Sequence, residues 1–307
     1  MLFVLPFLVM AIAFLSGYFS LESLQSVQVK GVINMAYINQ LDKSWLSAIG
    51  FVMVLGVAYL IFFLSERFKL LGQTTTLPSL IYILLTSGIM VNVGFDYLLI
   101  AVFIVTVAVW KLQMAINDTK SNGALYDFGF LIALSVAIYP KFILLIAWAF
   151  GVLFFSGRST LKDIVALWLG ILTPVLFIAF YYFWTDRLEL LPAIFTDNLM
   201  VGEHIHSLPA IEVRLGMIVL VLIIALTNLS ARYSLMIVNQ RRGILSLVSM
   251  MIFLSLTFVI IPGNYYDFMY MFAVPLSFLY AQYFICCRTA LFSNLVFVLL
   301  LAACFLT

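Results

Sequence analysis

The stretch Ile218-Val-Leu-Val-Leu-Ile-Ile-Ala-Leu226 decides the fold class of this chain. Its apolar side chains follow one another without interruption, whereas a strand of a membrane-spanning barrel alternates apolar and polar residues. Backbone groups in lipid must find hydrogen-bond partners within their own segment, which a helix provides. A bilayer core about 30 Å thick needs about 20 apolar residues per helix, and this run lies inside an apolar segment, 213–230, of nearly that length. We therefore expect an all-α membrane protein.

The composition extends this expectation to the whole chain. Of 307 residues, 65% are hydrophobic and 9% are charged, whereas about 25% of the residues of a soluble domain are charged. We predict one integral membrane domain over residues 1–307, a polytopic helical bundle of about eleven spans. The first segment has no basic residue before it and no cleavage site after it, so we expect it to remain as an anchor. The spans are expected near 2–19, 45–64, 77–91, 95–110, 127–139, 142–156, 164–184, 213–230, 244–261, 267–285 and 290–306.

The segment 127–156 can be read as one long tilted helix or as a hairpin that turns at Pro140 and Lys141. With the hairpin, ten basic residues fall on one membrane face and five, Arg214 among them, on the other. With one helix, the first face keeps six, the second takes eight, and Lys141 is left inside the membrane. Basic residues concentrate on the cytoplasmic side, so the charges favour the hairpin, a cytoplasmic amino terminus and an external carboxyl terminus. The ten are Arg67, Lys69, Lys111, Lys120, Arg158, Lys162, Arg232, Arg241, Arg242 and Arg288.

Two loops assigned to the external face are long, 20–44 and 185–212. Nine of the thirteen acidic residues fall on this face, although acids hardly influence insertion. This segregation indicates that the working face of the protein is external.

Both long loops contain a helical pattern of apolar residues. In the first loop, Val29, Val32, Ile33 and Ala36 fit the spacing i, i+3, i+4, i+7, and Tyr37 and Leu41 continue it, which predicts an amphipathic helix on the membrane surface. Val29, Ile33 and Tyr37 are therefore candidate partner-binding residues. The segment 190–199 of the second loop shows the same period and predicts a second surface helix.

Three charged residues near the external face are candidates for chemistry. Glu22 follows the first span and Asp42 precedes the second, and a carboxylate at this position can be a general base or an interfacial anchor. Lys141, at the outer turn of the hairpin, can bind a phosphate head group as a point charge or extend its ammonium group to the interface. Each residue thus has a functional and a structural interpretation.

Two polar groups in external segments complete the candidate sites. Tyr265, Tyr266 and Asp267 belong to an external turn, where they can contact a substrate or, for the aromatic residues, act as interfacial anchors. Glu203, His204 and His206 include the only two histidines of the chain. They are weak candidates for a metal site, and a solvated loop is the favoured interpretation. We expect no metal and no cofactor.

Other sequence features exclude some functional classes. No glycine-rich phosphate loop is present, so nucleotide hydrolysis is not expected. The net charge is +2 and no basic run exceeds the pair Arg241 and Arg242, so a nucleic-acid partner is not expected. The cysteines Cys286, Cys287 and Cys304 lie in or beside apolar segments and are interpreted as packing residues.

Several segments resemble known families. The two long loops and the hairpin Gly129-Phe-Leu-Ile-Ala-Leu-Ser-Val-Ala-Ile-Tyr-Pro-Lys141 resemble the C-type membrane glycosyltransferases, which use polyprenyl-phosphate sugars, and so does the aromatic-then-proline segment Tyr265 to Pro275. The chain has the single Glu22 where that superfamily usually has an acidic pair, and it lacks the usual basic residue before the aromatic-proline helix. An uncharacterised multi-pass family of Bacteroidetes is resembled more closely. The segments that carry this second resemblance are Leu64-Ser-Glu-Arg-Phe68, Thr76-Leu-Pro-Ser-Leu-Ile-Tyr82, Tyr126-Asp-Phe-Gly129 and Phe180-Tyr-Tyr-Phe-Trp-Thr-Asp-Arg187.

These resemblances imply a bacterial inner-membrane protein with a glycosyltransferase-like fold and a periplasmic carboxyl terminus. The favoured function is a non-catalytic scaffold, or a lipid- or partner-binding subunit, of an envelope assembly or export pathway. Its expected partners are membrane lipids, including polyprenyl phosphate, and other envelope membrane proteins. The alternative is an active glycosyltransferase that moves a sugar from a polyprenyl-phosphate donor on the periplasmic face.

Overall fold

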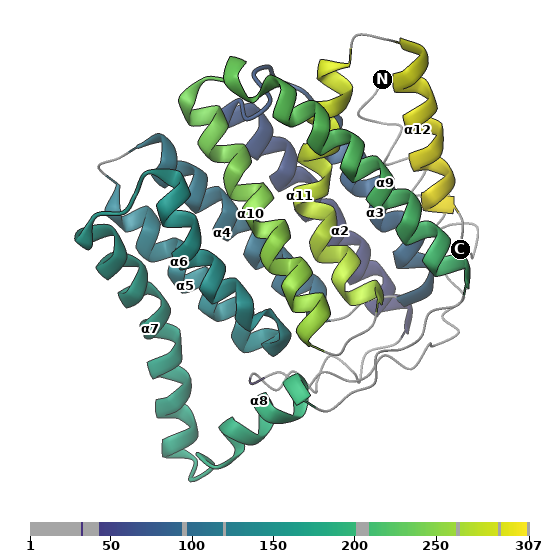
Figure 1. The fold of residues 1–307 in the computed structure, drawn as a ribbon. Helices are drawn as coiled ribbons and strands as arrows, with labels where there is room; N and C mark the ends of the chain where they lie inside the picture. Colours follow the sequence, from purple (N-terminus) through teal and green to yellow (C-terminus); the bar gives the residue numbers. More distant parts are fainter. Residues whose placement is uncertain are drawn as a thin grey trace.

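The structure, a computed structural model, describes residues 32, 43–93, 97–118, 121–200, 209–261, 265–287 and 290–305 (Figure 1). Every regular element in these residues is a helix, and they contain no strand. This confirms the all-α prediction for the described residues. The elements are α2 (Lys43–Phe68), α3 (Leu77–Val93), α4 (Tyr97–Asn117), α5 (Asn122–Ile138), η2 (Pro140–Ile143), α6 (Leu144–Ser156), α7 (Leu161–Trp184), α8 (Leu190–Met200), α9 (Pro209–Arg232), η3 (Tyr233–Leu235), α10 (Val238–Ile260), α11 (Tyr265–Cys286) and α12 (Ala290–Phe305).

The helices have the length and composition of a membrane protein. Among the described residues, six apolar helices are long enough to cross a bilayer, and four shorter apolar helices accompany them. The chain is thus a helical membrane protein. Every predicted span after the first overlaps a described helix, whereas the predicted span 2–19 lies outside the described residues. The six long segments are Ala48–Phe68, Tyr97–Asn117, Leu161–Trp184, Val213–Leu235, Val238–Ile260 and Met269–Cys286.

The chain reverses direction between α5 and α6, as the hairpin interpretation expects. Tyr139 is extended, with φ −129° and ψ 90°, because a residue before proline avoids the helical region. Pro140 then begins η2. Arg158, two residues after α6, lies against Ser121 at the start of α5. The two helices are therefore antiparallel.

Helices α5 and α7 pack with their backbones in close approach. A Cβ atom on Gly129 of α5 would lie 2.6 Å from the Leu167 carbonyl oxygen of α7, and one on Gly170 would collide with the Tyr126 carbonyl. Small residues allow helices in membranes to approach in this way. Since Arg158 contacts both Asn122 at the start of α5 and Asp163 at the start of α7, these two helices begin at the same end and run parallel.

Helix α7 is longer than α5 and extends beyond it. α7 has 24 residues and α5 has 17, and Figure 1 shows the last turns of α7 reaching past the bundle before α8 turns back. Phe180, Tyr181, Phe183 and Trp184 are exposed on these turns. Exposed aromatic residues at a helix end are typical of the membrane interface.

Candidate functional site

One end of the bundle collects basic residues, and we name it the basic end. The amide of Asn239 in the first turn of α10 donates to Asn117 at the end of α4 over 3.3 Å, and the guanidinium of Arg242 lies against Gly157 after α6. These contacts bring successive turns to the same end. The described basic residues there are Arg67, Lys69, Lys111, Arg158, Lys162, Arg232, Arg241 and Arg242, and the described acidic residues are Glu66, Asp118, Asp127 and Asp163.

At the opposite end, named the loop end, three distant segments meet at Val32. The Val32 N–H donates to the Ala137 carbonyl of α5 over 3.0 Å, and the Tyr182 hydroxyl of α7 donates to the Val32 carbonyl over 2.8 Å. Val32 is only 4% exposed. The long loop 20–44 is therefore anchored between α5 and α7 at this residue.

The predicted surface helix of the first loop is wrong at Val32. Val32 itself is a bend, and its N–H donates to the Ala137 carbonyl of α5. Both backbone groups of Val32 have partners outside the loop, so a continuous helix through this residue is not formed. In the second loop, by contrast, the predicted helix over 190–199 is confirmed as α8.

Lys141 lies in η2 and is 4% exposed. The short helix η2 contacts α8, which places the lysine beneath the second long loop. Two roles were predicted for Lys141. The burial of its side chain disagrees with the role in which the ammonium group extends freely to the interface. A buried lysine is retained only where protein groups or a ligand compensate the loss of water.

The polar residues of α8 point in different directions. Asn198 is buried, and its amide donates to the Ile194 carbonyl over 2.7 Å. Asp197 is exposed. The amide thus supports its own helix, and the two residues do not form one site.

The structure does not describe the side chains of the other predicted site residues. Tyr265, Tyr266 and Asp267 form the first turn of α11, of which the structure describes the backbone. The remaining candidates lie outside the described residues: Glu22, Val29, Ile33, Tyr37, Asp42, Glu203, His204 and His206. In the part of the chain that is described, no three His, Cys, Asp or Glu residues are grouped to hold a metal.

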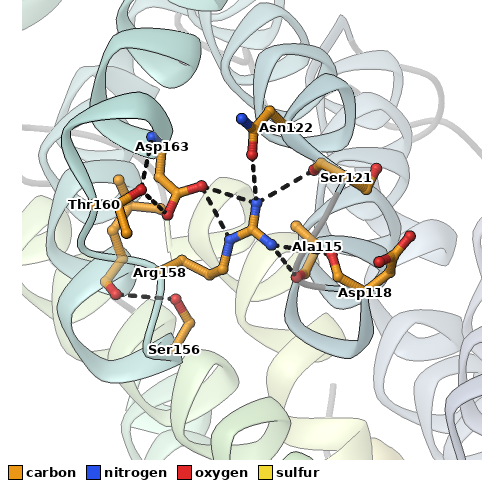
Figure 2. Close-up of polar contacts among 9 residues, drawn as sticks. Ala115, Asp118, Ser121, Asn122, Ser156, Arg158, Thr160 and Asp163 are labelled. Atoms are coloured by element: carbon orange, nitrogen blue, oxygen red, sulfur yellow. Dashed lines mark hydrogen bonds and ion pairs between the residues drawn. The ribbon is translucent and has the colours of Figure 1, made fainter.

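The basic end contains a buried network that the sequence interpretation missed (Figure 2). Arg158 is 3% exposed, and its Nη2 lies 2.8 Å from Oδ1 of Asp163. The Thr160 hydroxyl donates to the other oxygen of Asp163 over 2.7 Å. The remaining acceptors for the Arg158 guanidinium are the carbonyls of Ala115 (3.2 Å), Asp118 (3.0 Å) and Ser121 (3.4 Å) and Oδ1 of Asn122 (3.1 Å).

The geometry of this network indicates a structural role, which is to hold helix ends together. The guanidinium donates to the end of α4, the start of α5 and the start of α7, so it joins three helices at their termini. Helix carbonyls at a carboxyl end lack partners within the helix, and a cation satisfies them. Because its donors are occupied, Arg158 is not available to a ligand.

A second buried arginine, Arg214, was also missed. It lies near the start of α9, is 2% exposed, and makes a long bond of 3.5 Å to the Leu85 carbonyl of α3. Among the described groups, its Nε atom has no hydrogen-bond partner. The sequence signal was a basic residue one position inside the predicted span 213–230, where a charge is costly.

Comparisons with other proteins identify one family and no individual relative. The chain matches no curated protein and no solved structure. A family described as a family of unknown function, DUF6427, matches residues 12–306. The expectation of an uncharacterised family is confirmed, and the comparisons add no resemblance to glycosyltransferases. Because the match covers nearly the whole sequence, the chain belongs to the DUF6427 family.

Proposed function

We propose that this protein is a non-catalytic component of the bacterial inner membrane that serves an envelope assembly or export pathway. In this role it binds partner proteins or lipids through its loop end. The observation that carries the proposal is the anchoring of Val32 by Ala137 and Tyr182 beside the buried Lys141. The Val32 backbone and the Tyr182 hydroxyl hold segments together, whereas a catalytic group must reach a substrate.

The proposal includes a topology of about eleven crossings with a glycosyltransferase-like arrangement. The basic end faces the cytoplasm, the loop end faces the periplasm, and the carboxyl terminus is periplasmic. The eight described basic residues against four acidic residues at the basic end support this orientation. Membrane lipids, polyprenyl phosphate among them, and other envelope proteins are the proposed partners.

A second candidate function, a C-type glycosyltransferase, is favoured by Arg214. Its buried guanidinium, with a long bond to Leu85 and an Nε atom that has no described partner, is suited to an anionic ligand such as a lipid phosphate. In this alternative Glu22 or Asp42 is the general base. Lys141, Tyr265, Tyr266 and Asp267 then contribute to binding of the donor.

A pair of substitutions in the first loop separates the two functions. Glu22→Gln keeps size and hydrogen bonding but removes the proton acceptor, which typically lowers a general-base rate about 10²–10⁴-fold. Ile33→Asp instead introduces an unpaired charge into the apolar face proposed for partner binding. Asp197→Asn, at an exposed carboxylate of α8, is the matched control for loss of one acidic charge.

The variants are compared for envelope phenotype at equal protein level. Co-purifying proteins are identified from mild detergent. The scaffold proposal expects Ile33→Asp to lose partners and function, while Glu22→Gln and Asp197→Asn behave as wild type. A strong defect from Glu22→Gln alone would overturn the scaffold proposal in favour of the transferase.

A further inference from the structure

The basic end contains a cavity that none of the functions above uses. It has a volume of about 440 Å³, and its lining residues come from α9, from α11 and the residue after it, and from α12. Helices α11 and α12 both contact α9. Ligand sites in proteins typically measure about 300–1,000 Å³. The cavity is lined by Ile224, Thr227, Asn228, Arg232, Tyr283, Cys286, Cys287 and Phe292.

The wall formed by α9 changes from apolar to charged along the helix. Ile224, Asn228 and Arg232 follow one another at four-residue intervals, and this spacing places them on one face. Arg232 stands in the last turn of α9. The cavity is therefore apolar toward the middle of the bundle and cationic at its basic end.

The polar groups of this wall are available for a ligand. Within the described residues, neither Arg232 nor Asn228 makes a hydrogen bond or an ion pair, and both are half-buried. Arg158 at the same end differs, because its guanidinium is fully engaged. An arginine with free donors beside an amide is suited to the oxygens of a phosphate.

The opposite wall supplies mainly apolar and sulfur surface. Cys286 accepts a hydrogen bond from the Gln282 amide at 3.3 Å, and the Cys287 thiol lies 3.7 Å from the Tyr283 hydroxyl. Both thiols are thus engaged within α11 and its end. Thiols that pack in this way behave as small apolar groups.

We propose that this cavity binds the phosphodiester head group of an anionic phospholipid. The phosphate lies at Arg232 and Asn228, and the first part of an acyl chain lies along Ile224 and Phe292. Basic pockets between membrane helices on the cytoplasmic side bind anionic head groups. The excess of basic residues at this end raises the local concentration of such lipids.

The position of Phe292 favours a lipid over a soluble phosphate. Phe292 lines the cavity and is exposed on α12, together with Leu291 and Leu295. In a membrane these side chains face acyl chains. The cavity therefore opens beside the lipid, so a phospholipid reaches the arginine without leaving the bilayer. This site is at the end opposite to Val32 and Lys141, and it stands independently of the role proposed for the loop end.

The test measures lipid binding to the purified full-length protein by native mass spectrometry. The probes are dioleoylphosphatidylglycerol, dioleoylphosphatidylcholine and inorganic phosphate. Arg232→Gln is the test variant, and Arg67→Gln is the matched control because Arg67 is an exposed arginine of the same end outside the cavity. Asn228→Leu and Phe292→Ala are second variants that leave the charge unchanged.

We expect wild type and Arg67→Gln to bind phosphatidylglycerol in preference to phosphatidylcholine. Arg232→Gln should weaken phosphatidylglycerol binding about tenfold or more, since a hydrogen-bonded charge pair is lost. Asn228→Leu and Phe292→Ala should weaken it less. Equal binding by Arg232→Gln and wild type would overturn the site, and so would an equal loss in Arg67→Gln. If inorganic phosphate binds as tightly as phosphatidylglycerol, the lipid as the ligand is overturned.

Discussion

Replacing Arg158 with methionine should destabilise the protein more than removing any exposed charge of the basic end. Arg158→Met keeps much of the side-chain volume but removes every donor of the guanidinium. Asp163, 4% exposed, is then left as a buried carboxylate without its cation. The carbonyls of Ala115, Asp118 and Ser121 also lose the guanidinium as a donor, although the Asp118 carbonyl still accepts from the Ser121 N–H.

The magnitude follows from the burial of the pair. Removing one partner of a buried ion pair costs about 3–5 kcal/mol. The Thr160 hydroxyl still donates to Asp163 over 2.7 Å, so we place the loss of unfolding free energy near 3 kcal/mol, the lower end of that range. The double variant Arg158→Met with Asp163→Leu removes the unpaired charge and should regain about 1 kcal/mol or more.

A second ion pair of the basic end provides the matched control. Lys111 lies 2.7 Å from Asp127, but their side chains are 30% and 44% exposed. Exposed pairs contribute about 0–1 kcal/mol, so Lys111→Met should have a small effect. The distance between the charged atoms is 2.7 Å in this exposed pair and 2.8 Å in the buried pair. Burial therefore decides the difference between the two variants.

The free energy of unfolding is measured by reversible titration with dodecyl sulfate in mixed micelles, followed by circular dichroism. Wild type, the two single variants and the double variant are compared under one condition. A loss in Arg158→Met no larger than that in Lys111→Met would refute the reasoning. So would a double variant that is less stable than Arg158→Met.

Three further predictions concern other parts of the fold. Gly170→Ala should lower the unfolding free energy by about 1–3 kcal/mol because its Cβ would collide with the backbone of α5; Gly216→Ala, with no atom within 4 Å of its Cβ, should not lower it. Tyr182→Phe removes the hydroxyl donor to the first loop and should cost about 1 kcal/mol in the same titration, with faster proteolysis within 20–44; unchanged values for both would contradict the anchoring role. In a chain whose native cysteines are replaced by serine, an impermeant maleimide added to spheroplasts should label Glu189→Cys and not Asn239→Cys, both exposed positions; the reverse pattern would invert the proposed topology.

Most helices were predictable because each apolar run is long and its ends are marked by charge. The run around Ile218 to Leu226 lies inside α9, and the period over 190–199 became α8. The starts of two helices differ most from the predicted spans: α5 begins at Asn122 rather than at 127, and α10 begins at Val238 rather than at 244. The first turn of α10 contains Asn239, Gln240 and Arg241, and at the start of α5 the Arg158 guanidinium donates to the side-chain oxygen of Asn122. Hydropathy does not report a turn that is stabilised by such a distant side chain.

The candidate sites were less predictable because their contacts join residues far apart in the chain. Val32 fits a local helical period, yet its carbonyl accepts from Tyr182, 150 positions later. Arg158 and Arg214 entered the sequence interpretation only as charges that set orientation. The burial of both arginines depends on how turns and neighbouring helices pack together in space. This packing cannot be read from a single sequence. Lys141 was correctly placed at a reversal of the chain, but its enclosure depends on the packing of α8 against η2.

The unequal lengths of α5 and α7 give the protein two hydrophobic thicknesses side by side. Both helices start at Arg158 and run in the same direction, but α7 is longer, with 24 residues against 17. At 1.5 Å per residue, α5 rises about 26 Å, which is less than the thickness of a bilayer core of about 30 Å, and α7 rises about 36 Å, which is more. We expect the turn after α5 to lie below the level of the lipid head groups and Trp184 to lie among them. Depth-dependent quenching by brominated lipids would test this difference. Val32, which bonds to Ala137 near the end of α5, then lies below the head groups as well, and a change in bilayer thickness would act on this contact before it acts on the basic end.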